Sequence, residues 1–100
     1  MRIMALDYGD ARTGVAISDE CGILCGETQV LAERDAERLA ARVLELAEAR
    51  GCGLILLGLP LNMDGSEGPR AEKARAFAAL LSQSGAPEVL LRDERRTSVE

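Results

Sequence analysis

The chain has 100 residues, enough for one domain with a single core and too few for two. Its composition, 47% hydrophobic and 29% charged, is that of a globular protein rather than a disordered one. It contains no histidine, which excludes a Ser-His-Asp triad, a Cys-His dyad and a zinc site with histidine ligands. Hydrolytic chemistry would therefore depend on carboxylates, with or without a metal ion.

The cysteines and the N-terminus indicate where the protein works. Cys21, Cys25 and Cys52 form no C-x-x-C pair, and we interpret them as reduced core or turn residues. The first residues lack a signal-peptide pattern, and the longest apolar stretch, Leu54–Leu61, is far shorter than the ~20 residues that cross a bilayer. The sequence predicts a soluble, cytoplasmic protein without a membrane segment.

Charge is distributed unevenly along the chain. The net charge of −5 argues against indiscriminate binding to nucleic acid. Acidic residues concentrate in 19–48, however, whereas residues 69–96 carry six basic side chains against four acidic ones. A local basic surface of this kind suits a positioned polyanion. One Phe, one Tyr and no Trp disfavour a platform of aromatic side chains for stacking single-stranded bases.

The N-terminal third predicts three short strands without a helix between them. Apolar runs at residues 2–8, 13–18 and 23–31 are separated by turn-forming residues at 9–12 and 19–22. Three consecutive strands with tight connections indicate an antiparallel meander.

The remainder alternates helices and strands. A helix is expected between Asp35, which can cap it, and Gly51, which can end it; its apolar residues at helical spacing are Leu39, Ala40, Val43, Leu46 and Ala47. The run 54–57 predicts a central parallel strand, followed by a loop over 58–68. A second helix should begin at Pro69, with Ala74, Phe77, Ala78 and Leu81 as its buried stripe, and a last strand should cover 88–92. The order βββαβαβ indicates an α/β fold with a mixed sheet and the first strand near its centre.

The last four residues, Thr-Ser-Val-Glu at 97–100, form a capping-box pattern. We interpret it as the start of a helix that the chain does not contain, so that the domain 1–100 is truncated at its C-terminus; the alternative is a frayed polar tail. Such a helix would cover the sheet near Leu6 and Leu90. Without it, we expect a symmetric homodimer through that apolar face, or a longer molecule.

Three loops carry the candidate chemistry, and the first follows Asp7. This carboxylate interrupts an apolar pattern, so its burial would cost free energy unless a cation or hydrogen-bond donor compensated. The glycine turn after it would let a ligand approach the backbone. The alternative is that Asp7 only caps its own turn.

The second loop, residues 58–70, leads into the N-terminus of the second helix. It follows the carboxyl end of a parallel strand, where open sheets bind ligands, and helix N-termini favour anions. Arg70 and Lys73 lie in the first helical turn, where cations oppose the helix dipole and a bound phosphate would reverse that effect. Alternatively, solvent and Glu67 or Glu72 screen the two cations.

The third loop, residues 92–98, contains Asp93 and Glu94 among three arginines. These residues could hold a metal ion and grip phosphates around it, or they could form a solvated cluster of internal ion pairs. Because all three loops follow strands at one edge of the predicted sheet, Asp7 and Glu94 could face each other. Carboxylates without histidine or thiolate suit Mg²⁺ or Mn²⁺, and two such ions can hydrolyse phosphodiesters.

Three segments resemble the YqgF/RuvX family, nucleases similar to Holliday junction resolvases and implicated in maturing the 5′ end of 16S ribosomal RNA: MRIMALDYGDARTGVAISD, GLPLNMDGSEGPRAEKARAF and DERRTSVE. The resemblance implies an RNase H-like fold and a nuclease acting on structured nucleic acid, with Asp7 and Glu94 as metal-binding catalytic acids. Family members continue into a helix with a further catalytic Asp, so a chain ending at Glu100 is expected to have little nuclease activity. The residues expected to bind substrate are Arg12, Asn62, Gly65, Ser66, Arg70, Lys73, Arg95, Arg96 and Thr97.

Two other functions remain open. Asp7-Tyr8-Gly9 followed by Val15-Ala16 is also similar to the first phosphate motif of the actin, sugar-kinase and heat-shock ATPase superfamily, whose members need two such domains. The third possibility is a catalytically inactive nucleic-acid-binding or protein-binding module of the same fold.

Overall fold

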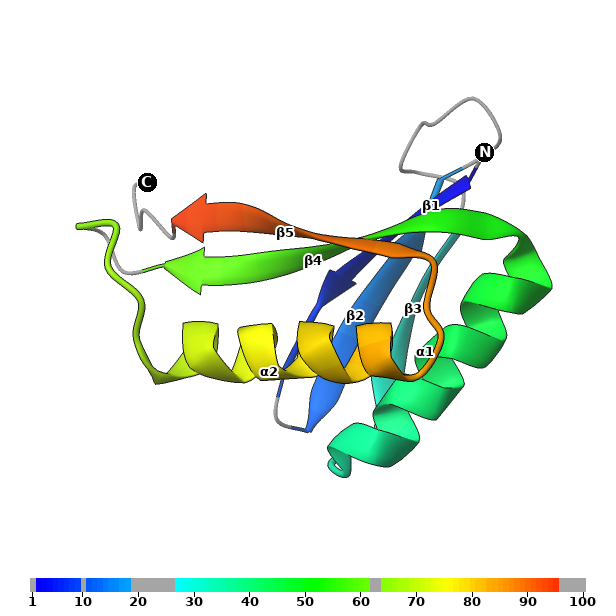
Figure 1. The fold of residues 1–100 in the computed structure, drawn as a ribbon, viewed down its shortest axis with the longest axis horizontal. Coiled ribbons are helices and arrows are strands. Elements are labelled where there is room, and N and C mark those ends of the chain that lie inside the picture. Colours follow the sequence, from blue (N-terminus) through cyan, green and yellow to red (C-terminus); the bar gives the residue numbers. More distant parts are fainter. Residues whose placement is uncertain (1, 10, 19–26, 62–63, 96–100) are drawn as a thin grey trace.

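The computed structural model describes residues 2–9, 11–18, 27–61 and 64–95, and for residues 93–95 the backbone alone. Its elements follow the predicted order βββαβαβ and confirm the α/β class (Figure 1). They are β1 Arg2–Asp7, β2 Arg12–Ile17, β3 Glu27–Ala32, α1 Ala36–Arg50, β4 Cys52–Leu61, α2 Pro69–Gln83 and β5 Glu88–Arg95.

The five strands form one mixed sheet in the order β3-β2-β1-β4-β5. β1 pairs antiparallel with β2, and β2 pairs antiparallel with β3, which is the predicted meander. β4 is parallel to β1, and β5 is parallel to β4. β1 therefore occupies the centre, as predicted, and the carboxyl ends of β1, β4 and β5 meet at one edge of the sheet.

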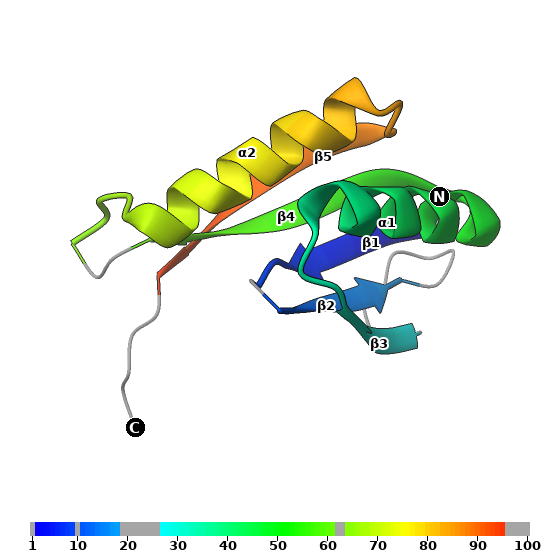
Figure 2. The same ribbon diagram turned by 90° about the horizontal axis from the view of Figure 1, so that it is seen from below.

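Both helices cover the same face of the sheet, and the opposite face carries neither of them (Figure 2). Alternate residues of the central strands are buried beneath the helices, including Leu6 on β1 and Leu57 on β4. The opposite face presents Leu90, which is 44% exposed, on β5 and Val30, which is 62% exposed, on β3. Leu6 itself is buried on the helix-covered face, whereas Leu90 lies on the uncovered face, so the further helix expected over the sheet near these two residues stays a prediction.

The helix boundaries follow the expected capping signals. Asp35 accepts a hydrogen bond from the Glu37 N–H at 2.9 Å, and Gly51 ends α1 with a φ of 69°. Pro69 takes the first position of α2. Most of the predicted stripe residues are buried, namely Leu39, Ala40, Val43 and Ala47 of α1 and Ala74, Phe77 and Leu81 of α2.

β4 and β5 are both longer than predicted. β4 continues through Leu61 and β5 through Arg95, because the two strands pair with each other along Gly58↔Arg92 to Leu61↔Arg95. β1 pairs with β4 only as far as Leu57, so beyond that residue the β1 side of β4 is a free edge. Proline, which lacks a backbone N–H, is tolerated at such an edge. The predicted loop over 58–68 consequently begins only after Leu61.

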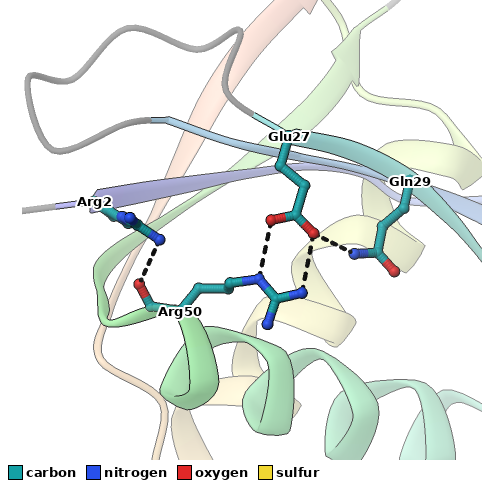
Figure 3. Close-up of polar contacts among 4 residues, drawn as sticks. All are labelled: Arg2, Glu27, Gln29 and Arg50. Atoms are coloured by element: carbon teal, nitrogen blue, oxygen red, sulfur yellow. Dashed lines mark hydrogen bonds and ion pairs between the residues drawn. The ribbon is translucent and has the colours of Figure 1, made fainter.

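An ion pair links the C-terminal end of α1 to β3 (Figure 3). Arg50 donates from Nε to Glu27 Oε1 at 2.9 Å and from its guanidinium to Oε2 at 3.1 Å, while Gln29 donates to Oε2 at 3.1 Å. Arg2 donates to the Arg50 carbonyl at 3.4 Å. The hydrogen bonds from Arg50 lower the pKa of Glu27, and this cluster fastens the helix layer to an outer strand of the sheet.

Three further sequence features have a partial outcome. Cys52 is a free, buried thiol whose pKa is raised by burial, as the core interpretation expects. Cys21, Cys25, the 19–22 turn and the 97–100 capping box lie outside the described residues. Neither helix among the described residues is long and apolar enough to cross a membrane.

Candidate active site

The two predicted catalytic acids belong to strands that end at the same edge of the sheet. Asp7 is the last residue of β1 and is exposed. Glu94 lies on β5 opposite Pro60, within a strand and not in a loop as predicted, because β5 continues its pairing with β4. Parallel strands with a common carboxyl edge therefore bring positions 7 and 94 to the same end of the sheet.

The register also gives their relative depth and face. Leu6 pairs with Leu57, so Asp7 lies level with the next residue of β4, Gly58. Gly58 pairs with Arg92, so position 94 lies two residues further along the strand direction than Asp7. Two strand spacings of about 4.8 Å and two rises of about 3.3 Å separate the Cα atoms of residues 7 and 94 by about 12 Å. By strand alternation both positions belong to the face that the helices leave uncovered.

The space beside Asp7 is open because its cross-strand neighbour is a glycine. Asp7 pairs with Gly14 on β2, where a Cβ would lie 3.7 Å from the Asp7 Cβ. Both residues line a hollow of about 600 Å³ on the uncovered face, together with Ala5, Ala16 and Val30 among others. A ligand can therefore reach the Asp7 carboxylate from this face.

The β1–β2 turn that follows Asp7 is tightly constrained. A Cβ on Gly9 would lie 2.3 Å from the Arg12 carbonyl oxygen, so only glycine fits without a shift of the backbone. The Gly9 N–H donates at 3.4 Å to Oγ1 of Thr13, which is fully buried. Thr13 rather than Asp7 thus accepts this N–H, and the turn fixes the end of β1.

The segment before α2 is tied back onto the helix. Leu61 bridges to Glu67, and Glu67 accepts two hydrogen bonds from Arg75, at 2.8 and 2.5 Å. These hydrogen bonds lower the pKa of Glu67. Glu67 thus forms a two-bonded pair with Arg75, and the alternative that solvent and Glu67 or Glu72 screen Arg70 and Lys73 stays a prediction.

The N-terminal turn of α2 meets the β1–β2 turn. Gly68 occupies the N-cap position, and no side chain of the described residues caps it. Arg70 and Lys73 line a small pocket of about 120 Å³ together with Tyr8 and Gly9. The structure therefore brings the predicted phosphate-binding cations next to the residues that directly follow Asp7.

The other predicted substrate residues either do not line this pocket or fall outside the described part of the chain. Arg12 is exposed at the start of β2, and Gly65 has a φ of 88°. Ser66 donates from its N–H and hydroxyl to Oδ1 of Asp64, at 2.9 and 2.6 Å. Arg95 is described by its backbone only, and Asn62, Arg96 and Thr97 fall outside the described residues.

Sequence reasoning missed an aromatic pair at this edge. The Tyr8 ring stacks on Phe77 of α2, with centroids 4.6 Å apart and an interplanar angle of 20°. Phe77 was predicted only as a core residue, and nothing in the local pattern pairs it with Tyr8. The position of Tyr8, between Asp7 and the constrained Gly9, was the one available signal.

The residues at this edge suit a hard divalent cation. Asp7 is exposed with open space beside it, and the backbone of β5 brings position 94 to the same edge. Oxygen donors of this kind are typical of Mg²⁺ and Mn²⁺ sites, in which water and substrate phosphates complete the ligand set. Within the described residues no group of three or more acidic or cysteine side chains comes together, so a metal ion at Asp7 would need further ligands from elsewhere.

Comparisons with known proteins agree on one family. Residues 1–100 match the family described as RuvX: Holliday junction resolvase. The chain is 48% identical over 101 residues to a protein of Pelotomaculum thermopropionicum named "Putative pre-16S rRNA nuclease", covering all of this chain and 66% of that protein. It is 44% identical over 100 residues to a protein of the same name from Halothermothrix orenii, covering all of this chain and 71% of that one.

Solved structures confirm the expected fold. RuvC of T. thermophilus in complex with a Holliday junction substrate has a TM-score of 0.64 at 15% identity, covering 93% of this chain and 64% of that one. A ROK family protein from Streptococcus pneumoniae has a TM-score of 0.63 at 17% identity, covering 93% of this chain and 34% of that one. The likeness to RuvC confirms the RNase H-like fold, and the match over all 100 residues shows that the chain belongs to the RuvX family of Holliday junction resolvases.

Proposed function

We propose that this chain forms the core of a divalent-metal-dependent nuclease that hydrolyses phosphodiester bonds in structured nucleic acid. The observation that carries the proposal is the position of Asp7 and Glu94 at one edge and on one uncovered face of the sheet, beside the basic first turn of α2. Family membership supports the same reaction class.

Asp7 and Glu94 would hold Mg²⁺ or Mn²⁺. When bound, such an ion supplies an activated water and stabilises the leaving oxygen. The protein has no histidine, so no imidazole is present to act as the base instead. Asp7 is held for this role by the constrained turn at Gly9, and Gly14 keeps the approach to its carboxylate open. The chain spans about two thirds of the length of the Pelotomaculum thermopropionicum relative.

Arg70 and Lys73 would bind substrate phosphates near the carboxylates. A bound phosphate turns their unfavourable interaction with the N-terminus of α2 into a favourable three-way arrangement of anion, cations and helix dipole. They recognise backbone charge, so they add affinity without sequence preference. This is the expected behaviour of an enzyme that recognises the shape of a folded RNA or a branched DNA.

The names of the relatives support a precursor of 16S ribosomal RNA as substrate, and the family description supports branched DNA. The two substrates share a structured phosphodiester backbone. Comparison of a folded RNA that carries the precursor 5′ end with a four-way DNA junction separates them.

The test is a cleavage assay with Mn²⁺ on both substrates, using the protein, Asp7→Asn and Glu94→Gln. Each variant is expected to lose cleavage while it keeps substrate binding. Glu48→Gln is the matched control, because Glu48 is an exposed carboxylate near the C-terminal end of α1, close to the start of β4 and so at the opposite end of the sheet from the carboxyl edge. Unchanged cleavage by Asp7→Asn contradicts the proposal.

The same assay series includes ATP. The fold is shared with a Bacteroides thetaiotaomicron protein described as having an actin-like ATPase fold, at a TM-score of 0.53, so the fold alone does not separate a nuclease from an ATP-binding module. Turnover of ATP without cleavage of either nucleic acid favours the latter.

A further inference from the structure

The chain's two aromatic side chains meet at a hollow on the helix-covered side of the active edge. The sequence has one Tyr, one Phe and no Trp, and the Tyr8 and Phe77 rings stack on each other. Phe77 is 2% exposed and Tyr8 is half-buried, so the buried ring holds the outer ring in a fixed orientation. An aromatic surface that is ordered in advance costs little entropy when a ligand stacks on it.

A hollow of about 390 Å³ opens beside this aromatic pair, between the beginnings of α1 and α2. One side is a helical stripe of α2 with Lys73, Ala76, Phe77 and Leu80, and the other side is Arg34 and Ala36. The small side chains of Ala36 and Ala76 leave the space between the helices. Its size lies within the range of pockets that bind small molecules, roughly 300–1,000 Å³.

The rim of this hollow includes Arg34 and Lys73, and the two acids beside Arg34 have arginine partners of their own. Glu33 and Asp35, on either side of Arg34, approach Arg42 at 3.9 Å and Arg38 at 3.8 Å. Lys73 also lines the smaller pocket with Gly9 and Arg70, so the two hollows share Tyr8 and Lys73. The larger hollow is therefore mainly apolar and aromatic, and it adjoins the smaller hollow, which is lined by the cations Arg70 and Lys73.

We propose that these two hollows bind one nucleotide, with its base against Tyr8 in the larger hollow and its phosphate beside Arg70 and Lys73 in the smaller. A flat apolar ring attached to a phosphate matches both compartments at once. The site lies on the helix side of β1, whereas Asp7 belongs to the opposite face, so it is separate from the metal-binding carboxylates. One aromatic position serves a single base, which agrees with the scarcity of aromatic residues in the sequence.

The nucleotide has two possible sources, an unpaired residue of the nucleic-acid substrate or a free nucleoside monophosphate. The first rests on the proposed nuclease function, and the second does not. Both share the same chemistry, and competition distinguishes them. If the site binds an unpaired nucleotide of the substrate, an RNA hairpin with one unpaired nucleotide should displace AMP from Tyr8. If the site binds a free nucleoside monophosphate, that hairpin should displace AMP poorly.

Tyrosine fluorescence provides a direct readout, because Tyr8 is the single tyrosine and there is no tryptophan. AMP is expected to quench it more strongly, and at lower concentration, than inorganic phosphate or adenosine alone, without any divalent cation. Free tyrosine titrated in parallel corrects for light absorbed by AMP. No change in the Tyr8 signal with AMP, or equal effects of AMP and phosphate, overturns the proposal.

Variants separate this site from the carboxylates. Ala76→Leu fills the hollow and is expected to weaken AMP binding about tenfold or more, the effect of losing roughly one base-stacking contact. Ala79→Leu is the matched control, since Ala79 is exposed on the same helix and does not line the hollow. Arg70→Gln should weaken both AMP and phosphate, and Asp7→Asn should leave AMP binding unchanged even where it abolishes cleavage. AMP affinity that is equal in Ala76→Leu and Ala79→Leu contradicts the site, whatever the outcome of the nuclease assay.

Discussion

Asp7 stands directly opposite Gly14 across the β1–β2 ladder, and the missing side chain at Gly14 leaves the space beside the Asp7 carboxylate open. A Cβ at Gly14 would lie 3.7 Å from the Asp7 Cβ, an ordinary contact distance, so a small side chain fits there and a larger one fills the approach. The glycine is thus important for access to Asp7 and not for the backbone conformation.

Gly14→Val is therefore expected to fold normally and to lose cleavage by at least about tenfold. Valine favours strand conformation, so stability in urea should be preserved or increased. Gly14→Ala is the matched control and should retain most of the cleavage. A Gly14→Val protein that is as active as the original would show that the approach to Asp7 is from another direction.

Gly9→Ala tests the turn that fixes the end of β1. The added Cβ would lie 2.3 Å from the Arg12 carbonyl oxygen, and the backbone shift is expected to lower the free energy of unfolding by about 1–3 kcal/mol. Urea denaturation measures this loss. Gly51→Ala is the comparison, because Gly51 has a φ of 69° and open space around it, so only the left-handed backbone costs energy there, about 1 kcal/mol.

The helix–strand ion pair of Glu27 and Arg50 predicts a pH-dependent contribution to stability. Arg50 lowers the pKa of Glu27 below its ordinary value of 4.5, so the carboxylate stabilises the fold above that pH and the stabilisation is lost as the pH falls through the lowered pKa. Glu27→Gln should reduce the free energy of unfolding at neutral pH, and the difference should shrink in acid.

The control for this prediction is the same substitution in an Arg50→Gln background. Removing Glu27 should then have little further effect at neutral pH, since its partner is already absent. Equal losses in both backgrounds would mean that the ion pair contributes nothing measurable, as many exposed pairs do.

Arg70 and Lys73 are expected to bind phosphate without reading bases. Arg70→Gln and Lys73→Gln should each weaken binding to unrelated nucleic acids equally and reduce the salt dependence of log K by about one unit of slope. Arg38→Gln, which removes an exposed arginine of α1 paired with Asp35, is the control and should leave the slope unchanged. A loss confined to one sequence would assign these residues to base recognition.

The parts of the fold that depend on local signals were predictable from the sequence. Asp35, Gly51 and Pro69 mark helix ends through their own backbone and side-chain preferences, and the apolar spacing of each helix shows its buried face. Strand ends were less predictable. β4 and β5 extend past their apolar cores because they pair with each other, and neither sequence segment alone carries that information.

The candidate site shows the same division. The position of Asp7 and Glu94 at one edge follows from a general rule for parallel strands, so the sequence was sufficient to predict it. The Tyr8–Phe77 stack and the Glu67–Arg75 pair depend on how α2 and its preceding loop pack onto the sheet. Such contacts are set by tertiary packing, and no spacing in the sequence indicates them.

Binding of Mn²⁺ to the protein and its Asp7 and Glu94 variants tests the central claim most directly. Electron paramagnetic resonance measures free Mn²⁺ during titration of the protein, Asp7→Asn, Glu94→Gln and the double variant. If the two carboxylates share one site, each single substitution should weaken Mn²⁺ binding nearly as much as both together, because the losses at a shared site are not additive. Additive losses, or a Glu94→Gln protein that binds Mn²⁺ as tightly as the original, would contradict a shared site.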